Sequence, residues 1–280
     1  GAIYLFFTLV QTGPDGMPCS VTAWSRSLDL LTWTPPRAIT PRDPARNYSS
    51  PGNIVRAGGE WVLCLQTYPR PHGEKYGNQD ARVFVMRSPD LVTWSEPELL
   101  RVKGPDVPVA AMGRMIDPYL LQDKDDPGLW WCFYKQNGAS FSWSRDLRSW
   151  TYAGRVDAGE NVCVFVDGGE YVMYHSPRDG IGVKRSADLW HWLDTELLRL
   201  GQPDWPWARG RLTAGCVLDL RCEPRIGHAL LFFHGSDYPE DDPRGGFDTF
   251  ASIGLAWSRD LRQWRWPGEA GTAAPDRGSA

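Results

Sequence analysis

Short apolar runs of four to eight residues recur along the whole chain, separated by stretches rich in Gly, Pro, Asp and Ser. Runs of this length and spacing predict an all-β protein. Ten of them form five consecutive pairs, at residues 3–10 and 20–24, 60–67 and 82–86, 129–135 and 140–143, 170–176 and 180–183, and 228–235 and 251–257. A further apolar run precedes the last four pairs, at residues 51–58, 116–123, 160–168 and 213–220.

A seven-residue signature, Ser-x-Asp-Leu-x-x-Trp, follows every pair. Its five copies begin at Ser27, Ser88, Ser144, Ser186 and Ser258, and their closing Trp residues are 61, 56, 42 and 72 positions apart. Ser and Asp side chains readily accept hydrogen bonds from nearby backbone N–H groups, so the signature is expected to close the turn after the third strand. The Trp is expected to pack between neighbouring repeats. The signature is therefore interpreted as architectural.

Five such repeats predict a five-bladed β-propeller, with four-stranded antiparallel blades around a central channel. WD repeats would show a steadier period and a terminal Trp-Asp pair, and sialidase Asp boxes carry Gly where every copy has Leu. Residues 1–267 are predicted to form one propeller domain and residues 268–280 a flexible tail. Residue 1 begins at the second strand of blade one, so we expect the inner strand of that blade to precede it.

Composition narrows the classes of protein to which the chain can belong. Hydrophobic residues make up 42% of the chain and charged residues 23%, and the net charge is −4. These values are typical of a globular protein that neither spans a membrane nor binds nucleic acid. They leave the oligomeric state unknown. Residues 1–10 lack the features of a signal peptide, which favours the cytoplasm. Cys64, Cys132, Cys163 and Cys216 lie in apolar runs and are expected to be buried thiols. No cofactor or metal ligand is predicted, although a structural or central-channel cation such as calcium is compatible with the fold.

The candidate site follows from the propeller, because the inner strands begin, and the second strands finish, at one mouth of the channel. Asp117 and Glu160 each begin an inner strand, and the repeat alignment places them at equivalent depth. Two carboxylates over one pocket are the minimal equipment for splitting a glycosidic bond. Further polar residues at these strand ends are predicted to bind substrate: Asn53, Gln66, Arg114, Lys135, Gln136, His175, Arg211 and His234. Asp43 and the acids Glu240, Asp241 and Asp242 are expected to be loop residues.

The five signatures, the Asp-Pro that opens blade three and the Glu that opens blade four resemble the glycoside hydrolase family 43 propellers and their invertase-type relatives, families 32 and 68. This resemblance implies that Asp117 orients the substrate and that Glu160 is the general acid, its pKa raised by burial and neighbouring negative charge. It also implies a third carboxylate on the inner strand of blade one. The residue before Asp117 is Ile116 and the residue after Glu160 is Asn161, which favours family 43 over the invertase type.

The sequence therefore predicts an exo-acting glycoside hydrolase. Its expected substrate is a furanoside or pentose linkage, of the arabinofuranosidase, galactofuranosidase, xylosidase or fructofuranosidase type. The main alternative is a non-catalytic carbohydrate-binding propeller that lacks the blade-one carboxylate. A protein-interaction propeller would need no convergent carboxylates, and Asp117 and Glu160 argue against it.

Overall fold

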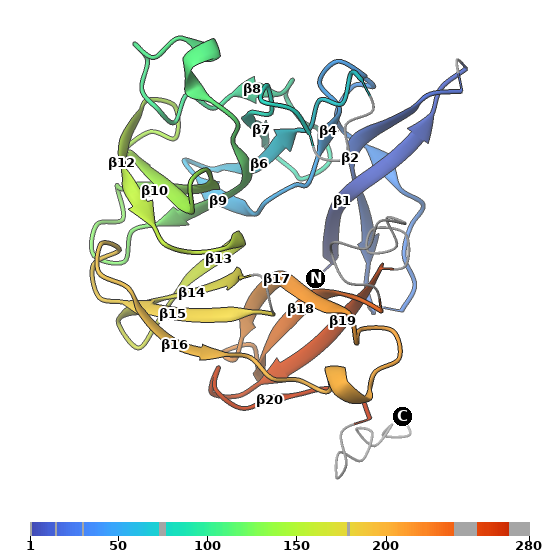
Figure 1. Ribbon diagram of the computed structural model, residues 1–280, viewed down its shortest axis with the longest axis vertical. Helices are drawn as coiled ribbons and strands as arrows, with labels where there is room; N and C mark the ends of the chain where they lie inside the picture. Colours follow the sequence, from blue (N-terminus) through green and yellow to red (C-terminus); the bar gives the residue numbers. More distant parts are fainter. Residues whose placement is uncertain are drawn as a thin grey trace. The chain divides into compact units, whose positions relative to one another are not determined.

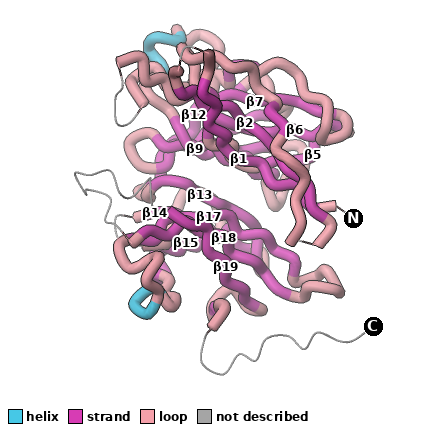
Figure 2. The backbone as a smooth tube through the Cα atoms, turned by 90° about the vertical axis from the view of Figure 1, so that its right-hand side faces the viewer, coloured by secondary structure: helices cyan, strands magenta, loops and turns pink. Residues whose placement is uncertain are grey.

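The computed structural model describes residues 2–14, 16–29, 31–72, 77–177, 180–237 and 251–268. Strands dominate these residues, and their only helical elements are two short 3-10 turns, Val109–Met112 and Gln202–Asp204 (Figure 2). The strands form five antiparallel sheets that follow one another along the chain. The predicted fold class, an all-β five-bladed β-propeller, is confirmed. The chain divides into two compact units, residues 1–157 with three blades and residues 158–280 with two.

The first unit contains blades one to three (Figure 1). Blade one consists of β1 (Ile3–Thr12), β2 (Pro18–Ser27) and β3 (Arg37–Ala38). Blade two consists of β4 (Tyr48–Ser49), β5 (Ile54–Ala57), β6 (Glu60–Thr67), β7 (Val83–Ser88) and β8 (Glu98–Leu99). Its inner strand is split, because β4 and β5 both pair with β6. Blade three consists of β9 (Ile116–Gln122), β10 (Trp130–Lys135), β11 (Ala139–Ser144) and β12 (Trp150–Val156).

The second unit contains blades four and five. Blade four consists of β13 (Glu160–Asp167), β14 (Glu170–Ser176), β15 (Gly182–Ser186) and β16 (Leu193–Leu197). Blade five consists of β17 (Arg211–Leu220), β18 (His228–Ser236), β19 (Ala251–Ser258) and β20 (Trp264–Arg265). The predicted inner, second and third strands are all present in both blades. Each of these two blades is thus a meander in which the strand order follows the sequence.

The five signatures form the same turn in every blade, as predicted. In blade two, the Ser88 hydroxyl donates to Asp90 Oδ1 at 3.2 Å, and that oxygen accepts the backbone N–H groups of Val92 and Thr93 at 2.8 and 2.7 Å. The other four copies repeat these bonds. The backbone N–H groups of Thr93 and Val92 lower the pKa of Asp90, because they stabilise its ionised form.

The Leu of the signature adopts a backbone conformation that the sequence did not reveal. In four copies its φ is positive: 65° at Leu91, 56° at Leu147, 69° at Leu189 and 61° at Leu261. This left-handed region costs an L-residue roughly 1–2 kcal/mol. Leu147, Leu189 and Leu261 are at most 2% exposed, and full burial of a Leu side chain returns about 1.5–3 kcal/mol. Burial of the side chain therefore explains why Leu replaces the Gly of Asp boxes.

Three of the five signature Trp residues are seen to pack between blades, as predicted. Trp94 of blade two meets Phe6 of blade one edge-on, with ring centroids 5.6 Å apart. Trp264 of blade five meets Tyr174 of blade four in the same way at 6.0 Å. Trp150 belongs to a buried cluster drawn from blades two and three, which also contains Val62. These three Trp residues thus extend the apolar area of a thin sheet into its neighbour.

Some expectations need correction or lie outside the described residues. Cys64, Cys132 and Cys163 are buried as predicted, but Cys216 is exposed. Glu240, Asp241, Asp242 and residues 269–280 of the predicted tail are not among the described residues. Within the described ranges, no helix is long and apolar enough to cross a membrane.

Candidate functional site

Asp117 lies in β9 at a β-bulge. The pairing of β9 with β10 shifts register between Phe133 and Lys135, and Asp117 has a φ of 53°. Asp tolerates this region better than most residues because its side chain is short and polar. The bulge bends the strand and breaks the regular alternation of side chains at the carboxylate. Asp117 is half-buried.

Gln66, near the end of β6, fixes the backbone of Asp117. Its side chain is 2% exposed, and its Oε1 accepts the Asp117 backbone N–H at 2.7 Å. A buried N–H at a bulge has no ladder partner, so this acceptor satisfies it. The amide of Gln66 therefore positions Asp117 in its unusual backbone conformation.

Asn53 joins the inner strands of blades two and three beside Asp117. Its Nδ2 donates to the Leu120 carbonyl and its Oδ1 accepts the Leu120 N–H, both at 2.7 Å. The Cys64 thiol donates to the Pro118 carbonyl at 3.3 Å, and burial raises the pKa of this thiol to about 12. A Cβ at Gly52 would lie 1.9 Å from the Pro118 oxygen. Blade two therefore holds Pro118 and Leu120, which follow Asp117 in β9.

Gln136 and Lys135 lie at the end of β10, opposite the start of β9. The Gln136 Nε2 donates to the carbonyls of Met112 and Arg114, both at 3.0 Å. Lys135 pairs with Ile116 in the sheet and is half-buried. The structure thus brings Asn53, Gln66, Arg114, Lys135 and Gln136 together with Asp117 in the first unit.

Glu160 begins β13 in the second unit and pairs with Ser176. The residue before it, Gly159, donates its N–H to His175 Nδ1 at 2.9 Å. An acceptor Nδ1 requires the neutral ring with its proton on Nε2. A Cβ at Gly159 would lie 1.7 Å from the Ser176 oxygen, and one at Gly182 would lie 2.6 Å from His175 Nε2. Buried His175 therefore fixes the chain that leads into Glu160. The close packing around it requires glycine at positions 159 and 182.

A second contact network lies next to Glu160. The Thr213 hydroxyl donates to Ser176 Oγ at 2.7 Å, and Asn161 Nδ2 donates to the same oxygen at 3.5 Å. Thr213 pairs with His234 in blade five. Ser176 therefore connects the inner strands of blades four and five. Arg211 begins β17 and pairs with Ser236, at the same end of blade five as His234.

The sheet registers correct the predicted equivalence of the candidate residues. The residue before each bulge pairs regularly with its second strand, in the pairs Ile116–Lys135, Glu160–Ser176 and Thr213–His234. Asp117 therefore corresponds to Asn161, whose φ is 52°, and not to Glu160. Likewise His175 lies one position before the residue that corresponds to His234. The two carboxylates therefore differ by one position in the register of their inner strands.

Sequence reasoning missed Tyr68, Gly159 and Ser176, each of which contacts a candidate residue or its backbone. The guanidinium of Arg114 lies 5.7 Å from the Tyr68 ring centroid, and its Nε donates to the Gly77 carbonyl at 3.2 Å. Tyr68 follows Gln66 by two residues, so a signal was available: alternate residues of an extended strand face the same side. Nothing in the sequence marks the partners of Gly159 and Ser176.

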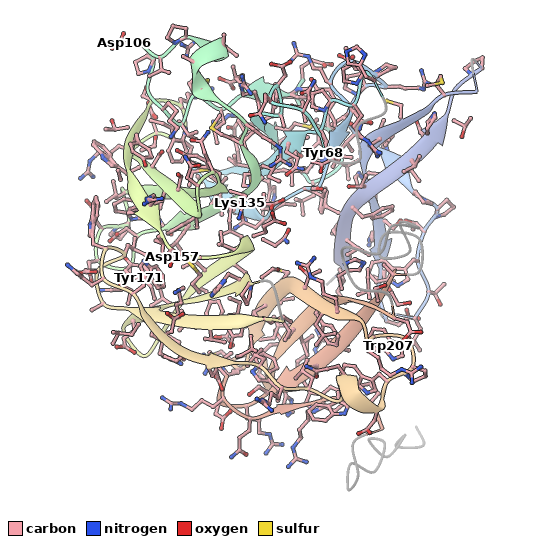
Figure 3. All side chains as sticks on the ribbon, viewed as in Figure 1. Tyr68, Asp106, Lys135, Asp157, Tyr171 and Trp207 are labelled. Atoms are coloured by element: carbon pink, nitrogen blue, oxygen red, sulfur yellow. The ribbon has the colours of Figure 1, made fainter. Side chains whose placement is uncertain are left out.

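The loops that carry Trp205 with Trp207 and Asp43 make contacts that stabilise the fold. Trp205 and Trp207, the latter labelled in Figure 3, stack on each other with centroids 5.2 Å apart, and Trp205 stacks on Phe233 at 5.7 Å. They cover the blade-five sheet. Asp43 accepts the N–H groups of Ala45 and Arg46 in a turn, as expected of a loop residue.

No group of three or more His, Cys, Asp or Glu side chains among the described residues could hold a metal ion.

Comparison with known proteins shows the fold. No family model and no curated protein matches the sequence. A crystal structure of an exo-1,5-α-L-arabinanase from a bovine ruminal metagenomic library matches with a TM-score of 0.63 at 14% identity, over 92% of this chain and 89% of the other. A GH43 β-1,3-galactosidase with galactodeoxynojirimycin matches with a TM-score of 0.61 at 13% identity, over 95% and 90%. The resemblance to family 43 is thus confirmed at the level of the fold.

Proposed function

We propose that the protein is a glycoside hydrolase. The observation that carries the proposal is the way in which buried side chains hold the backbone at two carboxylates. Asp117 and Glu160 each lie at the bulged start of an inner strand, and a buried side chain holds the adjoining backbone N–H in each case. Rigid support of this kind is what a reacting group requires. The fold shared with an arabinanase and a galactosidase supports the same conclusion.

In this proposal Glu160 is the general acid that protonates the departing glycosidic oxygen. Asp117 orients the sugar and stabilises the positive charge that develops at the anomeric carbon. Gln66 and His175 then act as positioning residues, because each bonds to backbone beside a carboxylate. Lys135, Arg211 and His234 remain proposed contacts to sugar hydroxyls.

The proposed substrate is a carbohydrate with a furanoside or pentose linkage, attacked from one end. The likeness to an exo-1,5-α-L-arabinanase supports this choice. A screen of nitrophenyl arabinofuranosides, galactofuranosides, fructofuranosides, xylosides and galactopyranosides would identify the sugar.

The Asp117→Asn variant tests whether the measured activity belongs to this site. It removes the charge and keeps the hydrogen-bonding shape, so kcat is expected to fall by at least ~100-fold. Asp106→Asn, which changes an exposed carboxylate in the same unit, should retain the wild-type rate. Tight binding of an oligosaccharide without turnover of any substrate would instead indicate the carbohydrate-binding alternative.

A further inference from the structure

Arg114 is held in one orientation before any ligand arrives. Its guanidinium lies over the Tyr68 ring, and its Nε donates to the Gly77 carbonyl. The turn that carries it is fixed as well, because the Gln136 amide binds the Met112 and Arg114 carbonyls. Gly113 has a φ of 73° in that turn. Little side-chain entropy is left for Arg114 to lose on binding a ligand.

The Tyr68 ring under Arg114 is held in place too. The Tyr68 backbone N–H donates to the Arg46 and Asn47 carbonyls at 3.0 and 3.1 Å. A Cβ at Gly77 would lie 2.8 Å from the Tyr68 ring, so Gly77 presses directly against it. The Tyr68 side chain is labelled in Figure 3. The ring is therefore held by its own backbone and by Gly77, the residue whose carbonyl also binds Arg114.

The terminal nitrogens of Arg114 are not used by the described residues. Among the described residues, the guanidinium makes one hydrogen bond, from Nε to the Gly77 carbonyl, and one ring contact, with Tyr68. Arg82, in the same unit, contrasts with this: it is 6% exposed and donates to the Gln79, Ala81 and Val109 carbonyls. Arg82 supports the fold, whereas Arg114 presents two oriented N–H₂ groups and a positive charge.

Arg114 and the candidate carboxylate belong to the same short stretch of backbone. Arg114 precedes Asp117 by three residues, and both are held by side chains near the end of β6. Gln66 binds Asp117, and Tyr68, two residues further on, holds Arg114. Lys135, paired with Ile116, adds a second positive charge at this end of blade three.

We propose that Arg114 and Tyr68 form a subsite for a carboxylate on the substrate, carried by a uronic acid joined to the furanoside or pentose unit that is cleaved. A guanidinium fork matches the two oxygens of a carboxylate and binds them by parallel charge-assisted hydrogen bonds. A neutral sugar offers no such partner. The inference rests on the proposed function, since it names the substrate class of the same site.

The test measures binding without requiring turnover. Galacturonate, galactose and acetate are titrated into the wild-type protein and followed by calorimetry. Galacturonate is expected to bind about tenfold more tightly than galactose, the gain typical of one charge-assisted pair. Arg114→Met should abolish this preference, and Arg114→Lys, which keeps the charge without the fork, should retain only part of it.

Arg56 provides a matched control in the same unit. Its guanidinium lies 5.2 Å from the Trp61 ring, next to the β5–β6 hairpin at the other end of blade two. Arg56→Met should leave the galacturonate preference unchanged. Circular dichroism on each variant establishes that it is folded.

Three results would overturn the inference: equal affinity for galacturonate and galactose, equal weakening of both sugars by Arg114→Met, or competition by acetate as strong as that by galacturonate. The proposed function is tested separately. Hydrolysis of neutral glycosides without a galacturonate preference would refute only the uronic-acid subsite, and Arg114-dependent galacturonate binding without hydrolysis of any glycoside would refute only the enzyme.

Discussion

Replacing Asp146 with alanine tests the role assigned to the signature turns. Asp146 closes the turn of blade three, where its Oδ1 accepts the backbone N–H groups of Arg148 and Ser149 at 2.8 and 2.7 Å and the Ser144 hydroxyl at 3.0 Å. Alanine removes the acceptor for all three donors. The two backbone N–H groups are exposed enough to bind water instead, so the turn is weakened rather than abolished.

Two estimates of the loss agree. Removing a capping side chain that accepts backbone N–H groups costs about 0.5–2 kcal/mol. Partial burial of Asp146 opposes ionisation, but the N–H groups of Ser149 and Arg148 outweigh it and hold the pKa at about 2 instead of 3.8. That difference corresponds to about 2 kcal/mol, and solvent screening of this exposed carboxylate reduces it to about 1 kcal/mol. We therefore expect a loss of about 1 kcal/mol in the free energy of unfolding.

Urea denaturation at several pH values measures this loss. The pKa of Asp146 is lowered in the folded protein, so its stabilisation is complete above the unfolded pKa and disappears as pH falls through the folded one. The difference between wild type and Asp146→Ala should therefore be full at pH 7 and shrink by about half near pH 3. Asp106→Ala, a change at an exposed carboxylate outside the five signature turns, is the control. Equal stability of the two variants, or a difference that persists unchanged at low pH, would refute the reasoning.

Three further predictions follow from individual contacts. Leu147→Gly should be more stable than Leu147→Ala by about 1 kcal/mol, because both lose the buried side chain but only Ala keeps the cost of positive φ; thermal unfolding of the pair decides this. Gln66→Met should reduce kcat more than it changes KM, since it frees the Asp117 backbone but removes no proposed substrate contact; steady-state kinetics would show the split. Asp167→Ala should cost about 1 kcal/mol in urea unfolding, because the half-buried guanidiniums of Arg185 and Arg221 lose their shared carboxylate and, among the described residues, keep only Glu170 and Asp219; a loss indistinguishable from that of an exposed carboxylate would contradict this.

The sequence predicted the blades well because their information is local. A strand pair followed by Ser-x-Asp-Leu-x-x-Trp specifies a turn through contacts between neighbouring residues, and all five copies form it. The positive φ of Leu147 was hidden, because its stability comes from burial among residues distant in sequence. Positive φ is normally a property of Gly or Asn.

The candidate site was predicted less completely, because position along a strand does not reveal the partner of a side chain. Gln66 and Asn53 were expected to bind substrate, yet their amides bind the backbone at Asp117 and Leu120. The repeat alignment also placed Asp117 level with Glu160. A bulge inserts one residue into a strand without a sequence mark, so only the sheet registers show the offset.

The leaving-group dependence of Glu160→Gln tests the central claim most directly. If Glu160 is the general acid, the variant should hydrolyse a glycoside with a sugar leaving group at least ~100-fold more slowly than wild type. It should hydrolyse a dinitrophenyl glycoside, which needs no protonation, at nearly the wild-type rate, with substrate affinity unchanged. Glu170→Gln, at the opposite end of the β13–β14 hairpin, should match wild type on both substrates. Wild-type rates for Glu160→Gln on both, or an equal loss on both, would contradict the account.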